Sequence, residues 1–408
     1  MRRRLAAAAA ATGVAAAALL FGGALREEPA SASVPDARAA SLRGFAHLER
    51  ARIDVDPSRY PAAARAFREA LRIGGEDALA YRGLAALAAA RHRFDESLVL
   101  AHKARRLRPD DHSVFGLIGD ANIELGRFRE AHRAFNRMVS LKPTSGGYAR
   151  ISYARELIGD TDGAIEAMRL AADSAGRPEP TAWALTHLGN LHAASGRLDR
   201  GVVAYRAALA RVPGYSPALV GLADVASRRG RLADAELLLR RALARVEDPG
   251  AAIALGDVLA ARSKDAARWY ARAAALEARF ARFGGRNLIE TALFDLDHDR
   301  NIRDALARAH AGLHDRPGVE GLHTYAWALY KNGRCRDALP YSDRALALAP
   351  TDTGALYHRA YIERCLGNAE AAARLVARVR ALDPTFAAPS PFRLRPTIAA
   401  WREQSSSG

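Results

Sequence analysis

The chain has 408 residues, of which 50% are hydrophobic but only 7% aromatic, and its formal net charge is +16. Alanine, arginine and leucine are abundant and no run alternates valine or threonine with polar residues, so the composition favours helix throughout and argues against a sheet-based fold. The charge would suit nucleic acid, but no zinc-ligand spacing or aromatic-basic recognition motif accompanies it. We therefore expect no nucleic-acid partner.

The first 32 residues have the pattern of an export signal. Three arginines at positions 2–4 precede an apolar stretch over 5–25, and Ala30-Ser31-Ala32 offers a small-x-small cleavage site. The same stretch is long enough to be an uncleaved membrane anchor. In either case we expect an exported protein, secreted or membrane-anchored, whose remaining residues face outside after a linker at 33–40.

From about Leu79 to Pro384 the chain repeats itself with a period near 34 residues. The clearest copy contains an aromatic residue, an apolar-Gly pair, a turn glycine, a small residue, a second aromatic and a closing proline. These are Phe115, Ile118, Gly119, Gly126, Ala131, Phe135 and Pro143. Apolar residues recur at three- and four-residue steps in both halves of the copy, which predicts two amphipathic helices that pair.

Neighbouring copies keep this pattern with substitutions, and we count about ten units. They include a degenerate copy around Ala305 and Pro317 and a split first copy around Ala63, Phe67 and Ala70. The pattern resembles that of tetratricopeptide repeat proteins. This resemblance implies an all-α, right-handed superhelical solenoid over residues 41–384, with a concave inner face.

The resemblance also implies where a ligand would bind, because first-helix side chains build the inner wall of such solenoids. One of them directly follows the apolar-Gly pair, and in the middle of this chain that column reads Asp120, Tyr153, Asn190, Asp224 and Asp257. Towards residue 384 the candidates are His323, Trp327, Tyr330, Tyr357 and Tyr361. Aromatic groups with a polar edge anchor peptides or sugars. The alternative is that the acidic residues are common at this offset and that the aromatic residues pack between helices.

The chain has two cysteines, and both lie at helix ends. Cys335 opens the second helix of one unit just after Gly333, and Cys365 closes the first helix of the next unit just before Gly367. Antiparallel stacking makes these helix ends neighbours, and exported proteins meet an oxidising compartment. We expect a disulfide; the alternative is a pair of small buried thiols.

No catalytic or metal-binding motif accompanies the repeats. The sequence contains no phosphate-cradling glycine loop, serine-nucleophile elbow or zinc-ligand run, so we expect no enzyme, no metal and no cofactor. The expected function is a non-enzymatic scaffold or adaptor outside the cytoplasm that binds a protein or peptide segment along the concave face. The alternative is a glycan or small-ligand binder of the cell envelope that uses the aromatic end of the groove.

Three further expectations concern the setting of the repeats. The stretch Ala326–Arg334 resembles the ending of exported tetratricopeptide repeat proteins from high-GC Gram-positive bacteria. Residues 1–32 carry four arginines and two glutamates, so the rest of the chain keeps a charge of +14. This excess either marks solvated helix faces or attracts anionic envelope polymers or lipid headgroups. Residues 385–408 are expected to form a capping segment, with Trp401 over the last apolar face, and a disordered tail.

Overall fold

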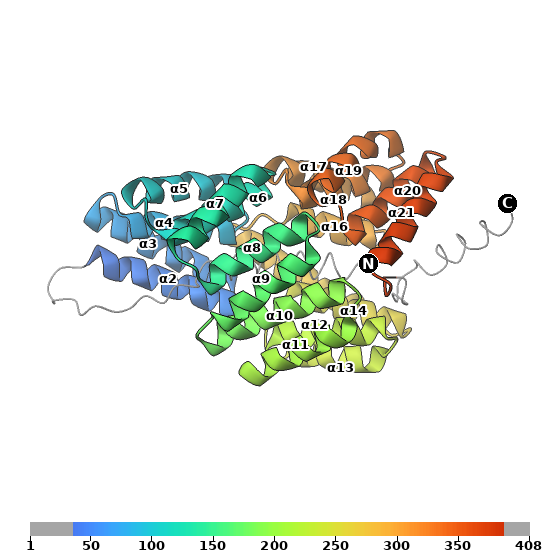
Figure 1. The fold of residues 1–408 in the computed structure, drawn as a ribbon, viewed down its shortest axis with the longest axis horizontal. Coiled ribbons are helices and arrows are strands. Elements are labelled where there is room, and N and C mark those ends of the chain that lie inside the picture. The colour runs from blue at the N-terminus through green and yellow to red at the C-terminus, as the bar shows by residue number, and fades with distance from the viewer. Residues whose placement is uncertain (1–35, 387–408) are drawn as a thin grey trace.

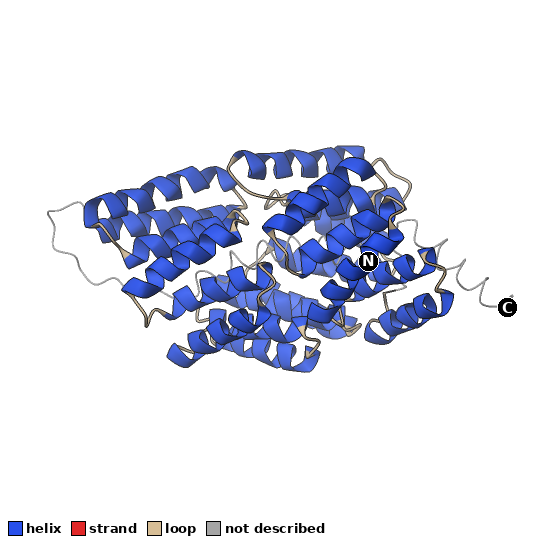
Figure 2. Ribbon diagram, turned by 90° about the horizontal axis from the view of Figure 1, so that it is seen from above, coloured by secondary structure: helices blue, strands red, loops and turns tan. Residues whose placement is uncertain are grey.

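The computed structural model describes residues 36–386, in which all regular structure is helical (Figure 2). Twenty α-helices form ten successive pairs, which confirms the predicted solenoid of about ten repeats. The pairs are α2 (Ala37–Asp54) and α3 (Tyr60–Gly74), α4 (Ala78–Ala90) and α5 (Phe94–Leu107), α6 (His112–Glu124) and α7 (Phe128–Leu141), α8 (Ser145–Leu157) and α9 (Thr161–Asp173), α10 (Pro178–Ala194) and α11 (Leu198–Arg211), α12 (Ser216–Arg228) and α13 (Leu232–Leu243), α14 (Pro249–Ala261) and α15 (Ala267–Arg282), α16 (Leu288–Asp297) and α17 (Ile302–Asp315), α18 (Val319–Lys331) and α19 (Cys335–Leu348), and α20 (Thr353–Cys365) and α21 (Ala369–Leu382). A short 3-10 helix, η1 (Pro57–Arg59), precedes α3.

In several pairs the two helices approach closely because a glycine on the first faces an aromatic ring on the second. A Cβ atom added to Gly119 would lie 2.1 Å from Cε1 of Phe135, and one added to Gly189 would lie 2.5 Å from Cε1 of Tyr205. Both rings are almost completely buried. The ring therefore occupies the space that any other side chain at the glycine would need.

Every pair turns from its first to its second helix through a residue with a positive φ angle. In chain order these are Val55, His92, Gly126, Gly159, Gly196, Gly230, Ser263, Asp299, Gly333 and Gly367, and the eighth pair has a second one, Asn301, directly before α17. Glycine adopts this left-handed conformation without steric cost, whereas the five other residues adopt it at some cost. The geometry of the turn is thus kept even in the units where the sequence pattern loses its glycine.

The solenoid begins earlier than the sequence predicted. Helix α2 starts at Ala37, inside the expected linker 33–40, because the Asp36 side chain caps it by accepting a hydrogen bond of 2.8 Å from the Arg38 backbone N–H. The expected export signal and the Trp401 cap lie outside the described residues. Among residues 36–386, no helix combines the length and the apolar character needed to cross a membrane.

The superhelix is wound so tightly that helix pairs far apart in the sequence touch, as α6 and α18 do at their adjoining ends (Figure 1). Turns inside the second to fifth pairs meet loops that follow the seventh to tenth pairs. We call this row of contacts the seam. Its members are His92 with Arg286, Gly126 with Pro317, Gly159 with Thr351, and Gly196 with Pro384.

A buried arginine holds the middle of the seam. Arg316 is only 4% exposed and donates hydrogen bonds to Glu124 on α6 (3.0 Å), Glu290 on α16 (2.5 Å) and Glu320 on α18 (2.6 Å). Burial by itself would lower the pKa of Arg316, but the three carboxylates raise it well above its usual value. The guanidinium therefore stays charged and ties the first superhelical turn to the second.

Candidate functional site

The winding of the superhelix forms a partly open cavity of about 880 Å³, which we call the interior cavity. First helices α8, α10, α12 and α14 supply the largest share of its wall. The ends of α2, α6 and α21, the starts of α18 and α20, Phe386, and parts of the second helices and connecting loops also line it. The cavity is thus lined by units from both superhelical turns.

The five residues predicted for the middle of the inner column all line this one cavity. They are Asp120, Tyr153, Asn190, Asp224 and Asp257, and they come from the first helices of five consecutive units. Because each unit places the same offset at a similar position on the inner wall, the column follows the cavity from α6 to α14.

Three of the five column residues also hold the framework. The Asp120 carboxylate accepts hydrogen bonds of 2.9 and 2.7 Å from Nε and Nη2 of Arg150, and both residues are buried. Asn190 accepts one of 2.8 Å from the Tyr205 hydroxyl. The Asp257 carboxylate accepts one of 3.0 Å from the Tyr270 hydroxyl and lies 3.0 Å from Nε2 of His298. Substituting these residues would therefore disturb the packing of the repeats.

The other two column residues are more available to a ligand. Asp224 is partly exposed and lies 3.7 Å from Nη1 of Arg228, whose Nη2 donates to Asp383. Tyr153 is partly exposed, and burial raises the pKa of its hydroxyl well above the usual value, so the hydroxyl is neutral at physiological pH.

The wall of the cavity carries more negative than positive charge. It contains nine carboxylates against four arginines: Asp120, Glu124, Glu156, Glu179, Asp224, Asp248, Asp257, Glu320 and Asp352, with Arg52, Arg197, Arg228 and Arg245. Arg150 and Arg316, behind the wall, neutralise part of this excess. An acidic interior in a chain of net charge +16 distinguishes the cavity from the rest of the molecule.

Sequence reasoning missed two aromatic groups in this wall, Trp183 and His187. Their rings lie 4.0 Å apart, and the Trp183 indole N–H has no hydrogen-bond partner among the described residues. Burial lowers the pKa of His187 to about 4, which keeps the ring neutral. The positions 183, 187 and 190 are spaced by four and three residues, so the three side chains share one face of α10. This spacing could have identified both residues from the sequence.

The predicted aromatic residues near α18 and α20 pack together and are not among the residues that line the interior cavity. Trp327 is 7% exposed; one face stacks on His358 at 3.7 Å, Tyr330 stacks at 4.9 Å, and Nε1 donates to Asp297 at 3.0 Å. His323 is buried with its Nε2 2.7 Å from Nδ1 of His358. The Tyr357 and Tyr361 hydroxyls are 2.9 Å apart. These contacts are the packing between helices that the sequence analysis gave as one alternative, and ligand binding by these residues stays a prediction.

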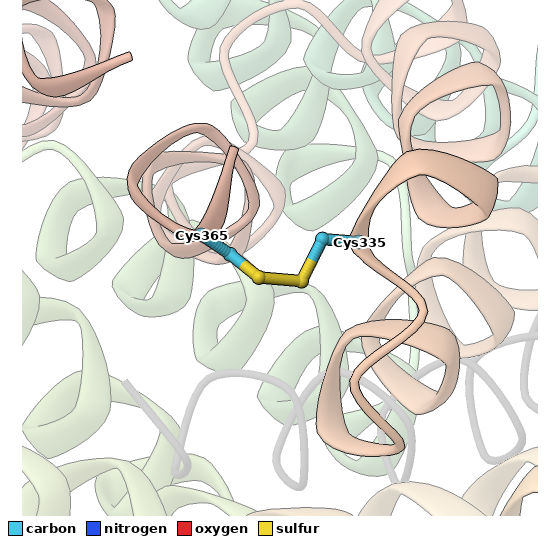
Figure 3. The surroundings of a disulfide bond; sticks show 2 residues. All are labelled: Cys335 and Cys365. Carbon is cyan, nitrogen blue, oxygen red and sulfur yellow. A yellow bond between two sulfur atoms is a disulfide. The ribbon is translucent and has the colours of Figure 1, made fainter. Parts of the chain in front are cut away.

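Cys335 and Cys365 form a disulfide that joins the start of α19 to the end of α20 (Figure 3). Their Cα atoms are 6.2 Å apart, and 30 residues separate them in sequence. The bond links the ninth helix pair to the tenth, at the helix ends that antiparallel stacking brings together.

Comparisons with known proteins agree with this architecture. Family models described as tetratricopeptide repeat match residues 192–257 and 324–385. Anaphase-promoting complex subunit 7 of Arabidopsis thaliana is 28% identical over 173 residues, which are 41% of this chain and 30% of that protein. This chain thus spans less than a third of the curated relative that it matches.

Several solved structures have a similar helical arrangement at low sequence identity. A tetratricopeptide repeat protein of Thermus thermophilus, TTC0263, is 19% identical with a TM-score of 0.41, covering 46% of this chain and 98% of that chain. Human IFIT1, in a dimer with m7Gppp-AAAA, is 17% identical with a TM-score of 0.48, covering 79% of this chain and 74% of that one. With two matched segments and ten helix pairs that share one residue pattern, the chain is a tetratricopeptide repeat protein.

Proposed function

We propose that this protein is a non-enzymatic scaffold that acts outside the cytoplasm and binds a segment of a partner protein in its interior cavity. Tetratricopeptide repeats are protein-interaction modules, and the finer proposal rests on one observation: the five column residues of consecutive units line a single cavity. A volume of about 880 Å³ is near the upper end of the roughly 300–1,000 Å³ range of ligand pockets. A few side chains of a partner would fill it.

Two features support action outside the cytoplasm. Residues 1–32 have the composition of an export signal, and the two cysteines of the chain lie in disulfide geometry. Disulfides persist in oxidising compartments and are rare in the cytosol. N-terminal sequencing of the protein recovered from cell fractions tests this directly. Recovery of the uncleaved, reduced protein from the cytosol alone would overturn the proposed location.

The partner site is tested by filling the cavity. Val220 lines it from α12, and Val220→Trp adds a large side chain without removing any of the described hydrogen bonds. Val203 on α11 is 68% exposed, so Val203→Trp is a matched control on the outer surface. We expect in-cell crosslinking and mass spectrometry to recover one protein with the wild type and with Val203→Trp.

Recovery of that protein should fall at least tenfold with Val220→Trp. Circular dichroism and thermal unfolding of both variants check that the fold is kept. Equal recovery with all three proteins would place the partner on another surface. Absence of any enriched protein would contradict the scaffold proposal.

A further inference from the structure

We propose that residues 387–408 of this chain bind in its own interior cavity and compete there with a partner. The inference uses the same cavity as the proposed function but does not require a partner to exist. It rests on the position at which the described chain ends, on the composition of residues 387–408, and on the charge of the cavity wall.

The described chain ends at the rim of the cavity. Phe386, the last described residue, lines the cavity together with Ala381 and Leu382. The exit point is fixed, because the Asp383 carboxylate is fully buried and accepts hydrogen bonds of 2.6 and 2.7 Å from Arg228 on α12. The Phe386 ring also packs 5.2 Å from that of Tyr357. The described part of the chain therefore ends beside the cavity.

Residues 387–408 have the chemistry that this cavity would accept. They carry four large apolar side chains, and three arginines against one glutamate: Phe392, Leu394, Ile398 and Trp401, then Arg393, Arg395 and Arg402, with Glu403. The apolar groups gain free energy by leaving water. The arginines are attracted by the acidic wall. In that wall the Arg228 guanidinium pairs with both Asp224 and Asp383.

Because residues 387–408 are covalently attached to the repeats, they have an advantage over a partner that is free in solution. Phe392 lies six positions after Phe386, and at about 3.3 Å per residue this span reaches roughly 20 Å. A short flexible link of this kind gives an effective concentration on the order of millimolar. An intrinsic dissociation constant of about 0.1 mM would then leave the cavity mostly occupied.

The test uses the full chain with a photo-crosslinking amino acid, p-benzoylphenylalanine, at position 392. Heavy- and light-isotope preparations are mixed before irradiation, so that crosslinks within one chain are distinguished from those between copies. We expect light–light and heavy–heavy crosslinks to residues of α10, α12 and α14 that line the cavity. The yield should fall at least fivefold with Val220→Trp and with Arg393→Glu combined with Arg395→Glu, and it should not change with Val203→Trp.

Several outcomes would overturn the inference. Crosslinks mainly to outer helices, mixed heavy–light crosslinks, or a yield that Val220→Trp leaves unchanged would each show that residues 387–408 do not occupy the cavity of their own chain. The proposed function has a separate readout, because partner recovery is measured on other samples. A partner lost with Val220→Trp but no crosslink into the cavity would remove only this inference.

Discussion

Gly196 lies directly against Pro384: a Cβ atom on Gly196 would be 2.8 Å from the Pro384 Cδ atom. The contact joins the turn of the fifth helix pair to the chain that follows the tenth. Gly230 occupies the same place in the next turn, with a φ angle of 76° against 73° for Gly196, and a Cβ there would have no neighbour within 4 Å. The two glycines therefore differ in the seam contact and not in backbone strain.

This difference predicts unequal effects of one substitution. Gly230→Ala should lower the free energy of unfolding by about 1 kcal/mol, the cost of a left-handed non-glycine residue. Gly196→Ala should cost about 1–3 kcal/mol more, because the methyl group also displaces the seam. Thermal and urea unfolding of both variants check this. Equal losses would mean that the seam contributes nothing to stability.

Arg316 should be among the most sensitive positions for stability. Arg316→Met leaves the carboxylates of Glu124, Glu290 and Glu320 without their common cation, and breaking a buried ion pair typically costs about 3–5 kcal/mol. Arg334→Met is the control, because Arg334 pairs with Asp337 at an exposed site where about 0–1 kcal/mol is expected. A loss below 1 kcal/mol for Arg316→Met, measured by urea unfolding, would argue against the seam as a structural contact.

The disulfide should stabilise the last two helix pairs. Closing a loop between Cys335 and Cys365, which are 30 residues apart, is worth roughly 3–4 kcal/mol in the chain-entropy description. We expect reductant to lower the melting temperature of the wild type and to have no effect on a Cys335→Ser, Cys365→Ser double variant. Hydrogen exchange should localise the loss to α18–α21. A melting temperature that is insensitive to reductant in the wild type would contradict this.

Glu277 should make stability depend on pH. Its carboxylate accepts a hydrogen bond of 2.6 Å from the Asn287 side chain, and burial raises its pKa from 4.5 to about 7. The folded protein then binds more protons than the unfolded chain between these values, so this contribution is present in full below about pH 4.5 and is lost as pH rises to about 7. The change amounts to at most about 3 kcal/mol.

Two substitutions of glutamate by glutamine, one buried and one exposed, test this pH dependence. Glu277→Gln should flatten the stability profile between pH 5 and 7 and raise the free energy of unfolding at pH 8. Glu370→Gln, whose wild-type side chain is 92% exposed, should leave the profile unchanged. Parallel profiles for the wild type and Glu277→Gln would rule out a raised pKa at this position.

Trp327 is expected to be more important for folding than for ligand contact. Because Trp327 is buried and its ring stacks on His358 and Tyr330, Trp327→Ala should cost about 3–5 kcal/mol of stability. Trp327→Phe, which keeps a ring but loses the hydrogen bond to Asp297, should cost about 1–3 kcal/mol. A stably folded Trp327→Ala variant that loses a glycan ligand would support the alternative function considered from the sequence.

The sequence by itself determined the helix pairs, the turns and the inner column, because these features depend only on neighbouring residues and neighbouring units. The 34-residue pattern predicted the helix pairs, Gly126 and Gly196 predicted turns, and the offset after the apolar-Gly pair identified the column that includes Asn190 and Asp224. These features depend on helix periodicity and on contacts between adjacent units, which repeat along a solenoid and are therefore visible in one chain.

Only the tertiary structure decided how the superhelix closes. The seam joins residues about 190 apart, such as Glu124 and Arg316, and no local pattern in the sequence relates them. Their meeting depends on the small rotation between successive units summed over a whole superhelical turn, so slight changes in each unit shift the contact by many ångströms. The same sum decides that the column faces a single cavity, and that the described chain ends at its rim.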